Sequence, residues 1–268
     1  MSILIAATDV LRLFAEGHPK IGVATLVQRM KWPKSTCSRV LAQMAEHDLL
    51  ERDPVDRQYR LGALVLQLGH AQRRAQLPLQ RQAHDALAQL CARSGHAGHL
   101  SILDGTDSVL LEQVAGSHPL QVMSPIGRRL PAHGTAMGRA LLSRLSDEGF
   151  IARYGADPAT RLPPSPPRCP QTVGALAQRV SAARAARSAS AFDEGLPGVA
   201  AVATTVHDSE TRTTLGLALS FPARQVSADE AEEFRHALVT LAASVGRAFG
   251  DPWWQVGATP PPPLLLIS

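Results

Sequence analysis

The sequence lacks several features that mark particular classes of protein. Its 268 residues contain only three cysteines, Cys37, Cys91 and Cys169, which lie far apart. Their odd number and wide spacing exclude a disulfide framework and a cysteine-based metal site, and they favour a reducing, cytoplasmic setting. No apolar stretch approaches the roughly 18 residues that a membrane span needs. The N-terminus also lacks the basic and apolar pattern of a signal peptide, so we expect no membrane association.

Catalytic and cofactor-binding motifs are missing as well. The chain contains no G-x-S-x-G, H-E-x-x-H, P-loop or G-x-G-x-x-G sequence. An enzyme remains an alternative, because His133 with Asp193 and His207 could form a catalytic or metal-binding cluster. These three residues fall on different predicted elements, and ten histidines make coincidence easy. We therefore expect no enzymatic activity, no cofactor and no metal site.

Acidic residues are absent between Gly17 and Ala45, and this gap holds all three lysines of the chain, Lys20, Lys31 and Lys34. Residues 1–75 contain 11 Lys and Arg against 7 Asp and Glu, so they carry the whole net charge of +4. The rest of the chain has 16 residues of each sign. A local basic cluster predicts a polyanionic partner, although a solvated surface explains such charges equally well.

The segment from Trp32 to Glu46 combines an apolar face with a polar face. The apolar residues recur at the spacing of one side of a helix, namely Cys37, Val40, Leu41 and Met44. The other side carries hydrogen-bonding and basic residues, namely Lys34, Ser35, Thr36, Ser38, Arg39 and Gln43. Pro33 suits the first helical position, where a missing N–H is not needed. A helix in a DNA major groove presents such a face to phosphates and base edges, but so does an ordinary surface helix.

The surroundings of this helix favour DNA binding. Apolar residues at helical spacing predict two preceding helices, over residues 4–16 and 23–30. Two short segments with the pattern of strands follow it, Leu49–Arg52 and Gln58–Leu61, around a turn that contains Pro54 and Arg57. This pattern predicts a basic β-hairpin, or wing. Helix, turn, helix and hairpin together predict a winged helix-turn-helix over residues 1–62.

The chain resembles the IclR-type (isocitrate lyase regulator) family of bacterial transcription regulators. The matching residues are Pro33-Lys34-Ser35-Thr36, Arg39-Val40-Leu41, Leu49-Leu50-Glu51-Arg52-Asp53 and Tyr59-Arg60-Leu61-Gly62. In that family these residues form the recognition helix and the wing. Two departures are visible: Met30-Lys31-Trp32 replaces the usual Thr-Gly-Leu-like turn, and Asp56 stands where a wing glycine is common. The resemblance covers roughly residues 6–250.

The rest of the chain is predicted to form a linker helix and a second domain. Residues 63–77 have the leucine pattern of a helix, and Pro78 marks the domain boundary. Residues 78–250 mix helical and alternating segments, which predicts an α+β fold. Strands are expected at residues 99–103, 108–114, 120–123, 199–206 and 214–221, and helices at 79–91, 172–187 and 228–249. The proline-dense residues 155–171 are expected to form an irregular loop, and residues 251–268 a disordered tail.

The resemblance implies that residues 78–250 are a GAF/profilin-like effector-binding domain. Residues 127–142 resemble the second signature of the family, at the edge of the effector pocket. Carried over residue by residue, the pocket consists of the backbone amides of Ala136 and Met137 with the residues Asp193, Ala201, Ala218 and Ser220. The alanines and the methionine favour an aromatic or longer acid over a two-carbon one. Asp193 would repel an anion unless it accepts from a ligand hydroxyl, carries a proton or lies outside the site. We therefore predict a hydroxylated aromatic acid.

These observations predict a ligand-responsive transcription regulator, either repressor or activator, of genes for the metabolism of a small organic or aromatic acid. One winged helix reads few base pairs, so two copies on a palindromic operator are expected. The resemblance implies a homodimer or a tetramer, with Val10, Leu13, Leu64 and Leu68 as candidate contacts. The alternatives are a small-molecule enzyme and a ligand-independent DNA-binding protein. The neutral C-terminal domain argues against the latter, since a DNA clamp would spread basic charge further.

Overall fold

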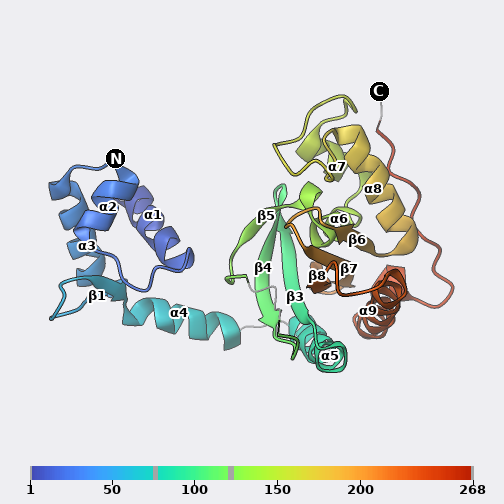
Figure 1. Cartoon of the computed structure of the whole chain (residues 1–268), viewed down its shortest axis with the longest axis horizontal. Coiled ribbons are helices and arrows are strands. Elements are labelled where there is room, and N and C mark those ends of the chain that lie inside the picture. Colours follow the sequence, from blue (N-terminus) through green and yellow to red (C-terminus); the bar gives the residue numbers. More distant parts are fainter. Residues whose placement is uncertain (1, 75–77, 120–123, 267–268) are drawn as a thin grey trace. The chain divides into compact units, whose positions relative to one another are not determined.

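Helices α1 to α4 and a two-stranded hairpin form the N-terminal unit of the protein (Figure 1). The structure, a computed structural model, describes residues 2–74, 78–119 and 124–266, and its contacts divide the chain into Met1–Leu77 and Pro78–Ser268. The elements of the first unit are α1 (Ile3–Ala15), α2 (Val23–Met30), α3 (Lys34–Glu46), β1 (Leu50–Arg52), β2 (Tyr59–Leu61) and α4 (Ala63–Arg74). The strands are antiparallel, with Leu50 opposite Leu61.

One apolar core holds this unit together. It contains the apolar face of α3, together with Val10 and Leu13 of α1, Leu26 of α2 and Tyr59 of the hairpin. The turn between α2 and α3 places Lys31 in the left-handed region at φ +55°, a conformation that costs a side chain free energy and that glycine adopts readily. Pro33 precedes the first turn of α3 as its N-cap rather than occupying the first helical position.

A six-stranded antiparallel sheet in the order β5-β4-β3-β8-β7-β6 forms the centre of the second unit. Its strands are β3 (Ala97–Asp104), β4 (Asp107–Val114), β5 (Arg129–Pro131), β6 (Ala189–Phe192), β7 (Val199–Asp208) and β8 (Thr213–Pro222). Its helices are α5 (Pro78–Ser94), α6 (Ala136–Leu142), α7 (Asp147–Tyr154), α8 (Val173–Ala186) and α9 (Ala228–Ala248), with short 3-10 turns η1 (Ala132–Gly134) and η2 (Pro252–Trp254).

The two faces of this sheet have different roles because side chains alternate along each strand. On β8, Leu217 and Leu219 point into the main core, which α5 and α9 cover. Ala218, between them, belongs to a separate cluster with α6. Figure 1 shows α5 and α9 on one side of the sheet and α6, α7 and α8 on the other. A helix-turn-helix followed by an α+β domain is the predicted fold class, and the structure confirms it.

The regular elements agree closely with the predicted ones, apart from short segments. Strand β6, strand β5 and helix α7 were not predicted, and the expected strand at residues 120–123 lies outside the described residues. The proline-dense segment 155–171 is irregular, as predicted. No helix of the described residues is long and apolar enough to cross a membrane.

The expectation of a disordered tail is wrong for the part of it that the structure describes. Asp251 caps η2, where Trp254 is buried, and the chain then follows α8. The Arg184 guanidinium donates to the carbonyl of Pro262 at 3.1 Å, and Leu264 is buried against α7 and α8. A proline-rich segment cannot form a helix, but its carbonyls still accept from arginine and its leucines still bury apolar surface. The prediction rested only on the general tendency of chain ends to be poorly ordered.

Candidate DNA-binding surface and effector pocket

The polar face of α3 is open to solvent. Cys37, Val40, Leu41 and Met44 are buried in the core, which turns the opposite side of the helix outward. Five of the six predicted DNA-contacting residues of α3 are exposed and the sixth, Thr36, is half-buried; the exposed ones are Lys34, Ser35, Ser38, Arg39 and Gln43. The helix therefore presents a continuous surface of amine, guanidinium, hydroxyl and amide groups.

The structure separates the basic residues of this unit into paired and unpaired ones. The Lys20 amine lies 2.6 Å from the carboxylate of Asp53 and 2.7 Å from that of Asp56, so wing carboxylates neutralise it. Arg60 is paired in the same way with Glu51, at 2.8 Å. In contrast, none of the carboxylates that the structure describes forms an ion pair with Lys34, Arg39 or Arg57. The charges of Lys34, Arg39 and Arg57 are therefore not neutralised by a carboxylate of the described residues.

The tip of the wing is built without the glycine that is common in the family. The carboxylate of Asp56 accepts from the backbone N–H of Gln58 at 3.0 Å, while Asp53 accepts from that of Val55 at 2.9 Å. These contacts hold the pKa of Asp53 at about 2, with Lys20 as the largest cause. Arg57, rather than Asp56, takes the left-handed conformation, with φ +60°. The exposed side chain of Arg57 is thereby carried at the tip of the hairpin.

The second unit contains a pocket between the α6 side of the sheet and the 193–199 loop, with a volume of about 830 Å³ that includes space open to solvent. Nine of its lining residues are apolar: Leu110, Leu130, Ala136, Met137, Ala191, Leu196, Val199, Ala201 and Ala218. The polar ones are His99, Ser101, Ser108, Ser124, Arg128, Thr135 and Ser220, and Gly195 completes the lining. A mainly apolar cavity with a few polar groups is typical of a small-molecule site.

Five of the six residues predicted for the effector site line this pocket: Ala136, Met137, Ala201, Ala218 and Ser220. Asp193 lies elsewhere. Its backbone is left-handed, at φ +54°, and its carboxylate accepts from the N–H of Gly198 at 2.7 Å and pairs with Arg168 at 3.3 Å. Asp193 therefore closes the 193–198 turn, and the structure gives it no place against a ligand in this pocket.

The start of α6 is fixed on the pocket wall by local contacts. The Thr135 hydroxyl accepts from the N–H of Gly138 at 2.9 Å and caps the helix. Gly216 of β8 leaves room for Met137, because a side-chain carbon at Gly216 would collide with the Met137 sulfur. Arg139, which is buried, forms an ion pair with Glu194 at 2.5 Å and so ties α6 to the loop that carries Leu196.

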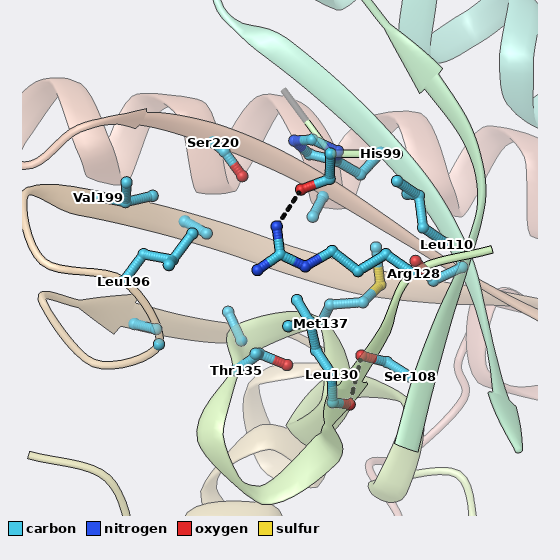
Figure 2. A pocket seen from close by; sticks show the side chains of 17 residues that line it. His99, Ser108, Leu110, Arg128, Leu130, Thr135, Met137, Leu196, Val199 and Ser220 are labelled. Carbon is cyan, nitrogen blue, oxygen red and sulfur yellow. Dashed lines mark hydrogen bonds between the residues drawn. The ribbon is translucent and has the colours of Figure 1, made fainter. Parts of the chain in front are cut away.

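Arg128 is the cation of the pocket. Figure 2 shows its side chain extended across the cavity towards Leu196. Its guanidinium makes one weak contact, to the hydroxyl of Ser124 at 3.5 Å, and pairs with no carboxylate of the described residues. The neighbouring Arg129 instead points to Asp104 and Asp107, at 2.6 and 3.1 Å. The sequence analysis assigned residues 127–142 to the edge of the effector pocket but did not include Arg128 among the pocket residues.

His99 lies on the strand wall of the same pocket (Figure 2). Burial lowers the pKa of its imidazole to about 4, so the ring is neutral near pH 7. Its Nε2 atom is sealed from solvent and has no hydrogen-bond partner among the described residues. Sequence reasoning missed this residue, although polar residues at positions 99 and 101 on either side of Leu100 were a signal for a polar strand face.

The imagined catalytic cluster does not form. His133 is buried in η1, His207 lies on β7 with its Nδ1 atom 2.9 Å from the hydroxyl of Thr214, and Asp193 has the contacts given above. Across the ranges that the structure describes, no three residues of the His, Cys, Asp and Glu types come together as metal ligands.

Comparison with known proteins establishes the family. Residues 6–54 match the IclR helix-turn-helix domain, and residues 72–247 match the family described as bacterial transcriptional regulator IclR C-terminal. The chain belongs to the IclR family. This IclR-family regulator is 30% identical to the HTH-type transcriptional regulator XynR of Escherichia coli over 247 residues, which cover 92% of this chain and 96% of that protein.

Solved structures share its fold. IclR of Thermotoga maritima has 21% identity and a TM-score of 0.73, and the match covers 92% of this chain and 98% of that one. An IclR homolog from Microbacterium hydrocarbonoxydans, complexed with 4-hydroxybenzoate, has 23% identity and a TM-score of 0.74, with coverage of 92% and 100%. Because the chain belongs to the IclR family, it is a transcription regulator and not an enzyme. Its helix-turn-helix domain binds DNA, and its C-terminal domain binds an effector.

Proposed function

We propose that this IclR-family regulator controls genes for the metabolism of a small organic or aromatic acid, and that the acid binds in the pocket beside α6. The observation that carries the proposal is Arg128, a guanidinium without a carboxylate partner among the described residues, inside a mainly apolar cavity. A carboxylate ligand supplies the missing counter-charge, and guanidinium–carboxylate hydrogen bonds are among the strong ones.

The walls of the pocket favour an aromatic acid. The side chains of Leu110, Leu130, Met137, Leu196 and Val199 surround the cavity and would contact a ring face. The backbone amides of Ala136 and Met137, at the start of α6, are close to the same space and can assist in binding a carboxylate. The relative from Microbacterium hydrocarbonoxydans that was solved with 4-hydroxybenzoate supports this ligand class.

A comparison of Arg128 with its neighbour Arg129 tests whether the carboxylate binds to Arg128 in particular. Calorimetry with benzoate should show binding to the wild-type protein and weaker binding of benzamide, which has the same shape without the charge. Arg128→Gln should weaken benzoate binding by roughly tenfold to a hundredfold, since hydrogen bonds to charged groups contribute about 1.5–3 kcal/mol. Arg129→Gln removes the same charge from a residue already paired with Asp104 and Asp107 and should leave binding unchanged. Equal effects of the two variants would contradict the proposal.

On the DNA side, we propose that the exposed face of α3 enters the major groove, where Arg39 also contacts a phosphate, and that Arg57 of the wing contacts the backbone. The residues assigned to the groove are Lys34, Ser35, Thr36, Ser38, Arg39 and Gln43. Their exposure and the absence of carboxylate partners among the described residues support the assignment. Specific binding can be measured on DNA selected by the protein from a random-sequence library. Loss of a base contact should then cost about 1–3 kcal/mol per site.

We further propose that a homodimer or tetramer binds a palindromic operator. Val10 and Leu13 are buried in the core of the first unit, so they are unsuited to subunit contacts. Leu64 is partly exposed and Leu68 more so, with 58% of Leu68 accessible, and their helix α4 also exposes Leu66. Light scattering at micromolar concentration should give at least a dimer, and Leu68→Asp should weaken it. A wild-type monomer that binds DNA one to one would contradict this assembly.

A further inference from the structure

The strand wall of the pocket carries a buried polar atom that forms no hydrogen bond with the residues that the structure describes. His99 lies on β3 opposite Ala218 of β8, and both side chains point to the pocket side of the sheet. The Nε2 atom of His99 is closed off from water and makes no hydrogen bond with any residue that the structure describes. A buried polar atom in this condition is unfavourable, so such atoms in native proteins call for a functional explanation.

The chemistry of the ring defines what can satisfy this atom. A neutral imidazole has one nitrogen that donates and one that accepts, and which is which depends on the tautomer. A hydroxyl group both donates and accepts, so it pairs with Nε2 in either tautomer. Burial holds the pKa of His99 near 4, so the ring carries no charge near neutral pH and offers no counter-charge to a carboxylate. Arg128 provides that charge in the same cavity.

We propose that His99 recognises a hydroxyl substituent of the effector, and that the pocket therefore selects a hydroxylated aromatic acid over the same acid without the hydroxyl. This inference rests on the proposed function, in which Arg128 holds the carboxylate. The hydroxyl is then bound by His99 on the strand wall of the pocket. Asp193 does not bind it, because its carboxylate contacts Gly198 and Arg168 and closes a turn. Ser101 and Ser220, on the same wall, add further hydroxyl groups around the ring.

Calorimetry with benzoate and the three hydroxybenzoate isomers tests the assignment. The wild-type protein should bind at least one isomer roughly tenfold more tightly than benzoate, the effect expected for one hydrogen bond to an otherwise unpaired buried group. His99→Phe keeps a ring of similar size without nitrogens, so the preference for the hydroxybenzoate over benzoate should be lost. His99→Gln retains hydrogen-bonding atoms and should keep part of it. His207→Phe is the matched control, because His207 is not among the residues that line the pocket and its Nδ1 atom already lies 2.9 Å from the hydroxyl of Thr214.

The outcomes separate this inference from the function on which it rests. Binding of benzoate and of all isomers with equal affinity would overturn the role of His99 and leave the carboxylate site intact. A preference for a hydroxybenzoate that survives in His99→Phe would overturn it too. Failure of every one of these acids to bind the wild-type protein would overturn both proposals. Loss of the preference in His99→Phe, with the melting temperature retained and the preference kept by the control variant, is the result expected.

Discussion

Two arginines of the DNA-binding unit carry the same charge but should contribute differently to DNA affinity. Arg39 is exposed on the polar face of α3 and pairs with no carboxylate of the described residues. Arg60 of the hairpin lies 2.8 Å from Glu51 and is equally exposed. Substitution of either residue by alanine lowers the charge of the unit by one. Only the first substitution should remove a contact with phosphate.

The expected size of the effect follows from counterion release. Each phosphate contact contributes about 0.9 to the slope of log affinity against log salt. Arg39→Ala should therefore lower this slope by about 0.9 for each bound copy, which makes the affinity about threefold less sensitive to salt between roughly 50 and 200 mM. Arg60→Ala should leave the slope close to that of the wild-type protein. Its contact with Glu51 is intramolecular and releases no counterion from DNA.

The slopes can be measured without knowledge of the operator, because phosphate contacts also supply non-specific binding. Fluorescence anisotropy of a labelled mixed-sequence duplex, titrated at several salt concentrations, gives the slope for each variant. Urea unfolding of both variants controls for damage to the fold. If Arg39→Ala and Arg60→Ala change the slope equally, net charge rather than the surface of α3 governs binding, and the assignment of α3 to the groove is wrong.

Three further predictions concern stability. Because the folded protein binds a proton at His99 only near pH 4 while the unfolded chain binds one near pH 6.5, acid favours unfolding. His99 should contribute a loss of about 2 kcal/mol in the free energy of unfolding between about pH 7 and about pH 5, and His99→Phe should reduce the loss in urea titrations by this amount. The contributions of His96 and His133, whose pKa values burial also lowers, should remain. Lys31→Gly relieves the left-handed backbone before α3 and should raise the stability of the first unit by up to about 1 kcal/mol, measured by Trp32 fluorescence. Gly216→Ala forces Met137 to move and should cost about 1–3 kcal/mol, with weaker binding of benzoate in calorimetry.

The sequence predicted best those elements whose burial leaves a periodic pattern. The apolar residues of α3 recur at helical spacing, which made both its core side and its polar side predictable. Strand β6 is only four residues long, from Ala189 to Phe192, and is composed of small residues with one aromatic, so no periodicity distinguishes it. It exists because it pairs with β7. That pairing belongs to the tertiary structure, and the sequence of the strand itself contains no pattern that predicts it.

Five of the six residues predicted for the effector site line one pocket, but the charged residue of that pocket was not predicted. Ala201, Ala218 and Ser220 lie on two adjacent strands, and strand alternation brings them to one face together. The direction of a side chain on an irregular segment cannot be read from spacing. Asp193 and Arg128 both lie on such segments, and the left-handed backbone at Asp193 turns its carboxylate to the N–H of Gly198. Asp193, which was carried over from the family pocket, therefore lies outside the pocket lining, and Arg128, which is part of the lining, was not predicted.

The ordered tail changes where the effector domain can be cut. The family match ends at residue 247, and a fragment that stops there or at residue 250 would omit Asp251. The carboxylate of Asp251 is fully buried and receives two hydrogen bonds from Arg144, at 2.7 and 2.8 Å, and one from the backbone of His207. Without it, the Arg144 guanidinium would stay in the protein interior with no counter-ion, a situation that destabilises proteins by about 3–5 kcal/mol. A minimal sensor module for biophysical work or for fusion to another DNA-binding domain should extend at least to Leu264.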